Sequence, residues 1–72
     1  MVIVDMMQTG KNIRQLQKVN HTNGRMLADI CGVTQAAVCK WGKDCMPSID
    51  ALVSMANIWN VKVDDIIATK VI

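Results

Sequence analysis

The chain of 72 residues lacks features that mark several large classes of protein. No apolar run approaches the roughly 18 residues that suggest a membrane-spanning helix. The amino-terminal MVIVDMM is too short for a signal peptide and has no basic leader. One proline and four glycines leave no room for a flexible linker, and no internal repeat is present. These absences predict one small cytoplasmic domain that covers residues 1–72.

Residues suited to catalysis or metal binding are also scarce. The single histidine, His21, has no acidic or nucleophilic partner at motif spacing, and there is no glycine-rich phosphate loop. The cysteines at positions 31, 39 and 45 form no CxxC pair, whereas zinc ligands are normally spaced more tightly. We therefore expect no enzyme, no metal, no cofactor and no small-molecule ligand. Free thiols fit a reducing compartment, and a thiol-based redox regulator would need two cysteines within bridging distance.

The charge of the chain is unevenly distributed. The formal net charge is +2, but residues 9–43 carry +5 and residues 44–72 carry −2. A basic half of this kind is the electrostatic pattern expected of a surface that faces phosphate. The alternative is that these side chains only solvate helices. The cations of residues 9–43 are Lys11, Arg14, Lys18, Arg25, Lys40 and Lys43, against Asp29 alone.

Residues 23–41, NGRMLADICGVTQAAVCKW, have the pattern of two short helices joined by a tight turn. Asn23 is a favourable N-cap for the first helix, and apolar residues follow it at helical spacing. Gly32 suits the left-handed backbone just past a helix end. Thr34 is a favourable N-cap for the second helix, which we expect over residues 34–41.

The helix at residues 34–41 has two different faces. At about 100° per residue, one arc is apolar and can anchor the helix. The other arc carries an amide, a methyl group, a thiol and an ammonium group but no acid. In a DNA major groove, such an amide can read adenine and such an ammonium group can meet guanine or phosphate. The apolar arc holds Ala37, Val38 and Trp41, and the polar arc holds Gln35, Ala36, Cys39 and Lys40.

The chain also resembles the Cro/lambda-repressor-like (XRE) transcription regulators over most of residues 9–67. The resemblance implies an all-α, five-helix DNA-binding domain with its helix-turn-helix at residues 23–41. In that fold the third helix reads an operator. The residues that carry the resemblance are Leu27-Ala28, Gly32-Val33-Thr34-Gln35, Val38, Lys40-Trp41, Pro47-Ser48-Ile49-Asp50, Asn60-Val61 and Val63-Asp64.

We therefore expect a sequence-specific transcriptional regulator, a repressor, that binds double-stranded DNA. A homodimer is expected because one small module buries little DNA surface. The alternative is an α-helical module for protein–protein contact, antitoxin-like or anti-repressor, which no longer binds DNA. Gln35, Ala36 and Lys40 are expected to face bases, and Asn12, Arg14, Arg25, Ala37, Cys39 and Lys43 are expected to lie near phosphates.

Two positions depart from the family pattern. The family often has a glutamine at the start of the second helix, where its amide holds a phosphate, but here Gly24 stands next to Arg25. Many members also pair an arginine near the end of the first helix with a glutamate after the recognition helix. The equivalents here are Gln17 and Gly42, so both charges are absent together and neither is left unpaired. This predicts a re-packed loop after Trp41.

The two ends of the chain are apolar. Residues 1–8 are expected to form an N-terminal arm, since Val2–Val4 favour a strand, and Thr69–Ile72 is its candidate partner. The strands can pair within one molecule or across a dimer. We favour exchange of arms in a dimer, because a free apolar edge invites uncontrolled association.

The remaining helices follow from caps and apolar spacing. Thr9 is expected to cap the first helix, with Ile13 and Leu16 facing inward. Ser48 is expected to start the fourth helix, and the fifth is expected over residues 63–68. The apolar stripe predicted for the fourth helix consists of Ile49, Leu52, Val53, Ala56, Ile58 and Trp59, with Met55 beside it.

Overall fold

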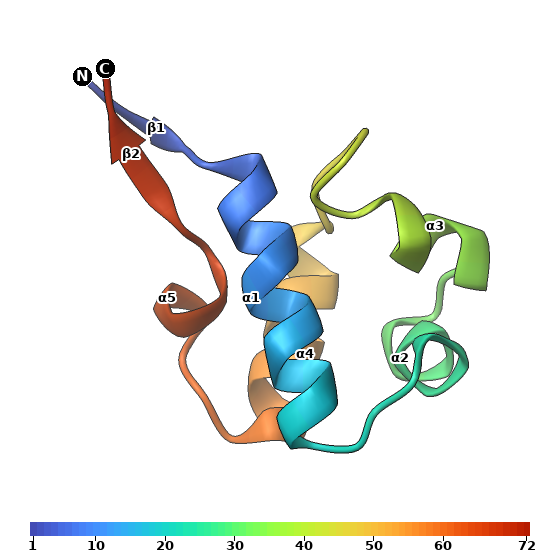
Figure 1. Ribbon diagram of the computed structural model, residues 1–72. Helices are drawn as coiled ribbons and strands as arrows, with labels where there is room; N and C mark the ends of the chain where they lie inside the picture. Colours follow the sequence, from blue (N-terminus) through green and yellow to red (C-terminus); the bar gives the residue numbers. More distant parts are fainter.

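The computed structural model describes all 72 residues as five helices and a two-stranded antiparallel sheet (Figure 1). Helix α1 runs through the middle, with α2 and α3 on one side and α5 on the other. No helix has the length and apolar character needed to cross a bilayer. The elements are β1 (Val2–Val4), α1 (Met6–Val19), α2 (Gly24–Cys31), α3 (Gln35–Lys40), α4 (Ile49–Trp59), α5 (Val63–Ile66) and β2 (Thr69–Val71).

Local side-chain chemistry sets most of the helix ends. Asn23, Thr34 and Ser48 each accept a hydrogen bond from the backbone N–H three residues later, at 2.8, 3.1 and 3.1 Å. Gly32 and Asn60 end α2 and α4 in the left-handed conformation, with φ of 67° and 53°. The predicted pair of helices over residues 23–41, joined by a tight turn, is confirmed.

Helix α1 begins four residues, just over one turn, earlier than the sequence predicted. Asp5 is its N-cap, with a side-chain oxygen 3.0 Å from the backbone nitrogen of Gln8. Thr9 is fully buried inside the helix, so the prediction that it caps α1 was wrong. Its hydroxyl donates to the Asp5 carbonyl at 2.7 Å and accepts from the Ala68 N–H at 3.0 Å. This second bond joins residues 59 positions apart, which local sequence signals cannot indicate.

The two ends of the chain pair within one molecule. Val2 lies opposite Val71, Ile3 opposite Lys70 and Val4 opposite Thr69 in the β1–β2 sheet. Exchange of arms between two chains is therefore not needed to pair these strands. Residues 6–8, expected to be part of an extended arm, instead form the first turn of α1.

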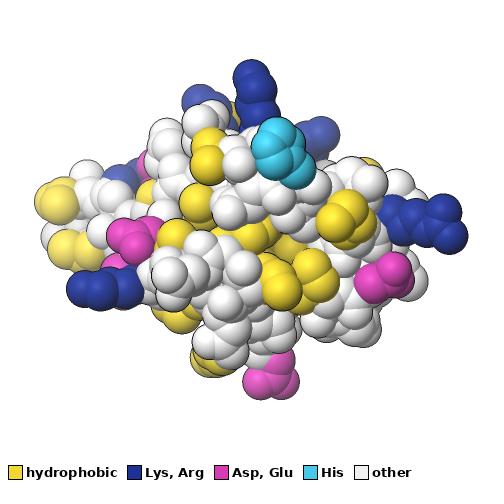
Figure 2. Space-filling model, turned by 90° about the horizontal axis from the view of Figure 1, so that it is seen from below, with side chains coloured by type: hydrophobic (Ala, Val, Ile, Leu, Met, Phe, Trp, Pro, Cys, Tyr) yellow, Lys and Arg dark blue, Asp and Glu magenta, His cyan; other side chains and the backbone are white.

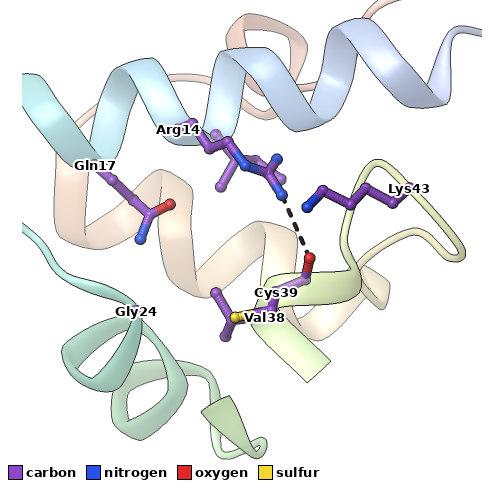
Figure 3. Close-up of a pocket in the computed structure, with 7 residues that line it drawn as sticks. Arg14, Gln17, Gly24, Val38, Cys39 and Lys43 are labelled. Carbon is purple, nitrogen blue, oxygen red and sulfur yellow. Dashed lines mark hydrogen bonds between the residues drawn. The ribbon is translucent and has the colours of Figure 1, made fainter. Parts of the chain in front are cut away.

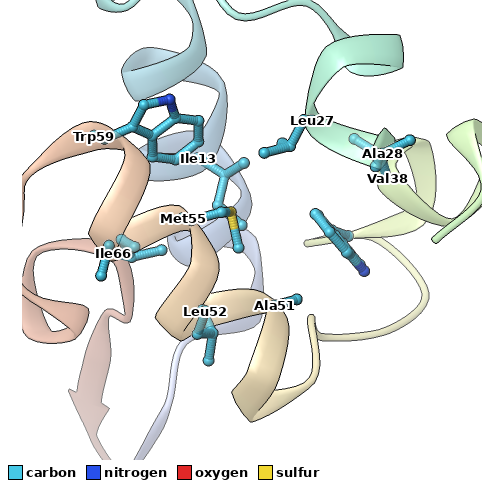
Figure 4. Close-up of a cluster of buried hydrophobic side chains, with 11 residues drawn as sticks. Ile13, Leu27, Ala28, Val38, Ala51, Leu52, Met55, Trp59 and Ile66 are labelled. Atoms are coloured by element: carbon cyan, nitrogen blue, oxygen red, sulfur yellow. The ribbon is translucent and has the colours of Figure 1, made fainter. Parts of the chain in front are cut away.

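A single core lies between the helices, and Figure 4 shows its side chains. Ile13 of α1, Leu27 of α2, Met55 of α4 and Ile66 of α5 are fully buried in it. Trp41 is 3% exposed, which confirms that it belongs to the apolar arc.

Helix α4 buries a different stripe from the predicted one. Ile49, Val53 and Ile58 are exposed, so this part of the prediction was wrong. The three polar residues of this helix recur at i, i+4 and i+7 and so share one face, and the three exposed apolar residues flank that face. The buried residues of α4 are Ala51, Leu52, Met55, Ala56 and Trp59.

Candidate nucleic-acid interface

Helix α3 presents a polar face that contains no acid. Gln35, Ala36, Cys39 and Lys40 are exposed, whereas Val38 is buried, as the predicted arcs require. The exposed residues are thus Cys39 and the three residues that were expected to contact bases.

Ala37 lies at the edge of this face and is half-buried. Its backbone N–H donates to the Thr34 hydroxyl at 3.1 Å, as part of the helix cap. The expected phosphate contact at Ala37 therefore has no free backbone donor to make it.

The N-terminus of α2 lies beside the start of α3. A methyl group added to Gly24 would lie 3.9 Å from both Cγ and Nε2 of Gln35, which is ordinary van der Waals contact. Arg25 follows in the first turn of α2 and is exposed. The structure thus brings Gln35 to the N-terminal end of α2, where the first N–H groups of α2 have no partner within the helix.

Cations line the side of α1 that faces α3. Lys11, Arg14 and Lys18 recur at i, i+3 and i+7 and therefore share one helix face. Arg14 borders three surface hollows, and Lys43 from the loop after α3 borders two of them. No acidic side chain lines any of the three. We call Lys11, Arg14, Lys18 and Lys43 the basic track.

The hollow nearest to α3 has a volume of about 190 Å³ and lies between α1, the start of α2 and α3. Figure 3 shows the Arg14 and Lys43 side chains on its rim, with Gln17 reaching toward it from α1. Gln17 donates from its amide to the Thr22 carbonyl at 3.2 Å, which ties the end of α1 to the following turn. An anion can therefore approach α3 from this side without meeting a carboxylate.

The Arg14 side chain, expected to lie near phosphates, is bonded to backbone carbonyls. Its guanidinium donates to the carbonyl oxygens of Gly10 at 2.8 Å, Trp41 at 3.1 Å and Cys39 at 3.5 Å. The bond to Cys39 is drawn in Figure 3. Arg14 thus joins α1 to the C-terminal end of α3.

The loop after α3 packs directly on the backbone of α1. Gly42, with φ of 84°, lies so close to Gly10 that a methyl group on Gly42 would stand 2.4 Å from the Gly10 Cα. A methyl group on Gly10 would stand 2.7 Å from the Gly42 Cα. This glycine–glycine contact lies in the loop after Trp41, where the sequence predicted a re-packed loop. Gly42 was singled out by its departure from the family pattern, whereas no local signal indicated a role for Gly10.

Asn12 lies on the wrong side of α1 for the role predicted from the sequence. Its amide nitrogen donates to the Ile66 carbonyl at 3.0 Å, and its amide oxygen accepts from Gln8 at 3.0 Å. Ile66 belongs to α5, which lies on the opposite side of α1 from α3 (Figure 1). We therefore remove Asn12 from the candidate DNA contacts.

The three thiols differ in their surroundings. Cys39 and Cys45 are exposed, whereas Cys31 is half-buried and its sulfur donates to the Ala51 carbonyl at 3.8 Å. Burial removes water from the thiolate and raises the pKa of Cys31 above its ordinary value.

We expect this raised pKa to weaken the fold at alkaline pH. The half-buried site favours the neutral thiol over the charged thiolate. The contribution of the thiol to the free energy of unfolding is therefore complete below the pKa of the unfolded state, about 8.5. That contribution is lost as the pH rises through the higher folded pKa. Urea unfolding from pH 7 to 10 should show a steeper alkaline loss of stability in the wild type than in Cys31→Ala. Cys45→Ala should keep the wild-type slope, and equal slopes in all three proteins would contradict the prediction.

No protein-family model matches this sequence, and a search of curated proteins finds no significant match.

Proposed function

We propose that this protein is a sequence-specific, double-stranded-DNA-binding transcriptional regulator with a lambda-repressor-like fold, acting as a repressor. The observation that carries the proposal is the exposed, acid-free face of α3 beside the basic track. Backbone phosphates need cations, and base edges need amides, ammonium groups and small side chains that permit close approach. Both sets occur together on this part of the surface.

Helix α3 has the dimensions for insertion into a major groove. An α-helix with its side chains is about 10–12 Å across, and the groove is about 12 Å wide. Gln35, Ala36 and Lys40 would face bases. Phosphates on the two sides of the groove would be neutralised by Arg25, Lys43 and the lysines of α1. Cys39 is exposed on the same helix and would lie close to the DNA backbone.

A homodimer in the cytoplasm completes the proposal. Three free thiols fit a reducing compartment. The two strands of the terminal sheet each leave an outer edge without a partner strand, and Val2, Val4 and Val71 are exposed on them. A closed two-fold contact would cover such edges and would leave α3 free.

The base-reading role of α3 is tested by Gln35→Ala. Loss of the amide should weaken binding to the preferred site by about 1–3 kcal/mol, with a much smaller effect on random DNA. Electrophoretic mobility shift or fluorescence anisotropy measures both affinities. Gln15→Ala, which removes an exposed amide from α1, should leave both nearly unchanged. Equal losses on the two DNAs would mean that Gln35 touches only the backbone.

A protein–protein interaction module is the second candidate, and exposed apolar side chains favour it. The face of the molecule in Figure 2 shows apolar side chains at its centre and cations toward its edges. Val19, Met26 and Ile58 are each at least 46% exposed. A contiguous apolar patch of several hundred Å² often marks a protein contact. Binding to duplex DNA that weakens steeply with salt distinguishes the regulator from such a module.

A further inference from the structure

The C-terminal end of α3 is held by one arginine from another helix. Arg14 donates to the carbonyls of Cys39 and Trp41, and a third bond to the Gly10 carbonyl fixes the guanidinium on α1. Helix C-termini carry partial negative charge and carbonyls without partners in the helix, so a cation is favourable there. A planar guanidinium with five donors can serve three carbonyls at once.

The position of Arg14 depends on the contact between Gly10 and Gly42. Gly42 follows Trp41 directly, and its backbone touches α1 where Gly10 has no side chain. This close approach brings the Trp41 carbonyl within 3.1 Å of an Arg14 nitrogen. We call the Gly10–Gly42 contact and the three Arg14 hydrogen bonds the α1–α3 clasp.

The clasp holds the residues on both sides of Lys40. Cys39 and Trp41 supply the carbonyls, and Lys40 between them is exposed on the polar face of α3. Helix α3 has only six residues, of which Val38 alone is buried. The buried side chains of Val38 and Trp41 anchor α3 to the hydrophobic core. The clasp adds a directional restraint on how the helix is rotated and tilted.

We propose that Arg14 is a positioning residue that sets the orientation of α3 and so determines sequence specificity, not a phosphate contact. This inference rests on the proposed DNA-binding function. Hydrogen bonds to base edges depend on distance and angle, whereas attraction to phosphate depends mainly on charge. Loosening the clasp should therefore reduce binding to the preferred site more than binding to random DNA.

The test compares Arg14→Lys and Arg14→Gln with two controls. Lysine keeps the charge but has no planar fork, so it cannot reproduce three bonds in this geometry. Lys18→Gln removes a cation from the same face of α1 without touching α3. Thr22→Val weakens the core elsewhere, because it removes the acceptor of the Trp59 indole N–H at 3.1 Å. Affinities for the preferred site and for random DNA are measured over a series of salt concentrations, where each variant is folded.

We expect the ratio of specific to random affinity to fall about tenfold in both Arg14 variants. Thr22→Val should keep the wild-type ratio, so a general loss of stability cannot mimic the effect. The salt dependence should keep its slope in Arg14→Gln, whereas Lys18→Gln should reduce the slope by about 0.9. Rescue by lysine together with a reduced slope in Arg14→Gln would show a phosphate contact and overturn the proposal. An unchanged ratio would also overturn it.

Hydrogen exchange in the free protein tests the clasp apart from DNA binding. The amides of Trp41, Lys43 and Asp44 donate to carbonyls at the end of α3, at 3.2, 3.0 and 3.0 Å. Both Arg14 variants should accelerate exchange at these amides, and Lys18→Gln should not. If the wild type binds no DNA but the exchange result holds, the proposed function fails and the clasp remains a feature of the fold. If exchange is unchanged in the Arg14 variants, the positioning role fails whatever the DNA result.

Discussion

Trp41→Ala should destabilise the protein by about 3–5 kcal/mol. Trp41 is 3% exposed and belongs to the same buried cluster as Leu27, Val38 and Leu52. Truncation leaves a cavity in this cluster that the surrounding side chains fill only in part. Native domains are stable by roughly 5–15 kcal/mol, and a chain of 72 residues lies near the lower end of that range. Little stability should therefore remain in the variant.

Thermal and urea unfolding followed by circular dichroism measure this loss. Lys40→Ala is the matched control, because it truncates the exposed neighbour on the same helix and should change stability by less than about 0.5 kcal/mol. A Tm for Trp41→Ala within a few degrees of wild type would show that the core does not depend on this side chain.

Gly42→Ala should cost about 2–5 kcal/mol, for two separate reasons. A non-glycine residue at φ of 84° is strained by about 1–2 kcal/mol. The new methyl group would also stand 2.4 Å from the Gly10 Cα, so the loop or α1 must move. Displacement of backbone in a close-packed region adds about 1–3 kcal/mol.

Gly32→Ala separates these two causes. Gly32 has a similar φ of 67°, but a methyl group added there meets nothing within 4 Å. It should therefore show only the backbone strain. Urea unfolding of the two variants gives the cost of the close approach as the difference between them. Equal losses would mean that the Gly10–Gly42 contact yields at little cost and that the three Arg14 hydrogen bonds do not depend on it.

The sequence predicted the elements whose signals are local. Asn23, Thr34 and Ser48 cap helices by bonding the N–H three residues later, and Gly32 ends a helix through its own backbone conformation. Each signal lies within a few residues of its effect. The two faces of α3 were also predictable, because helical periodicity alone separates Gln35 and Lys40 from Val38 and Trp41.

Features that depend on distant partners were missed. Thr9 looked like an N-cap, but Ala68 pairs with its hydroxyl and Asp5 caps the helix. In the candidate site, Arg14 and Asn12 are two residues apart on α1 and therefore point in opposite directions. Only the packing of α3 and α5 on either side decides which of them approaches the polar face.

Selection of DNA from a random duplex pool by the wild-type protein tests the central claim most directly. Enrichment of one motif, as two half-sites about one helical turn apart, is the expected result for a dimer that inserts α3 into successive major grooves. Affinity for that motif should fall steeply as salt is raised, because the lysines of the basic track displace counterions from DNA phosphates on binding. A pool that stays random, with no binding at low salt, would contradict DNA recognition and favour a protein–protein interaction module.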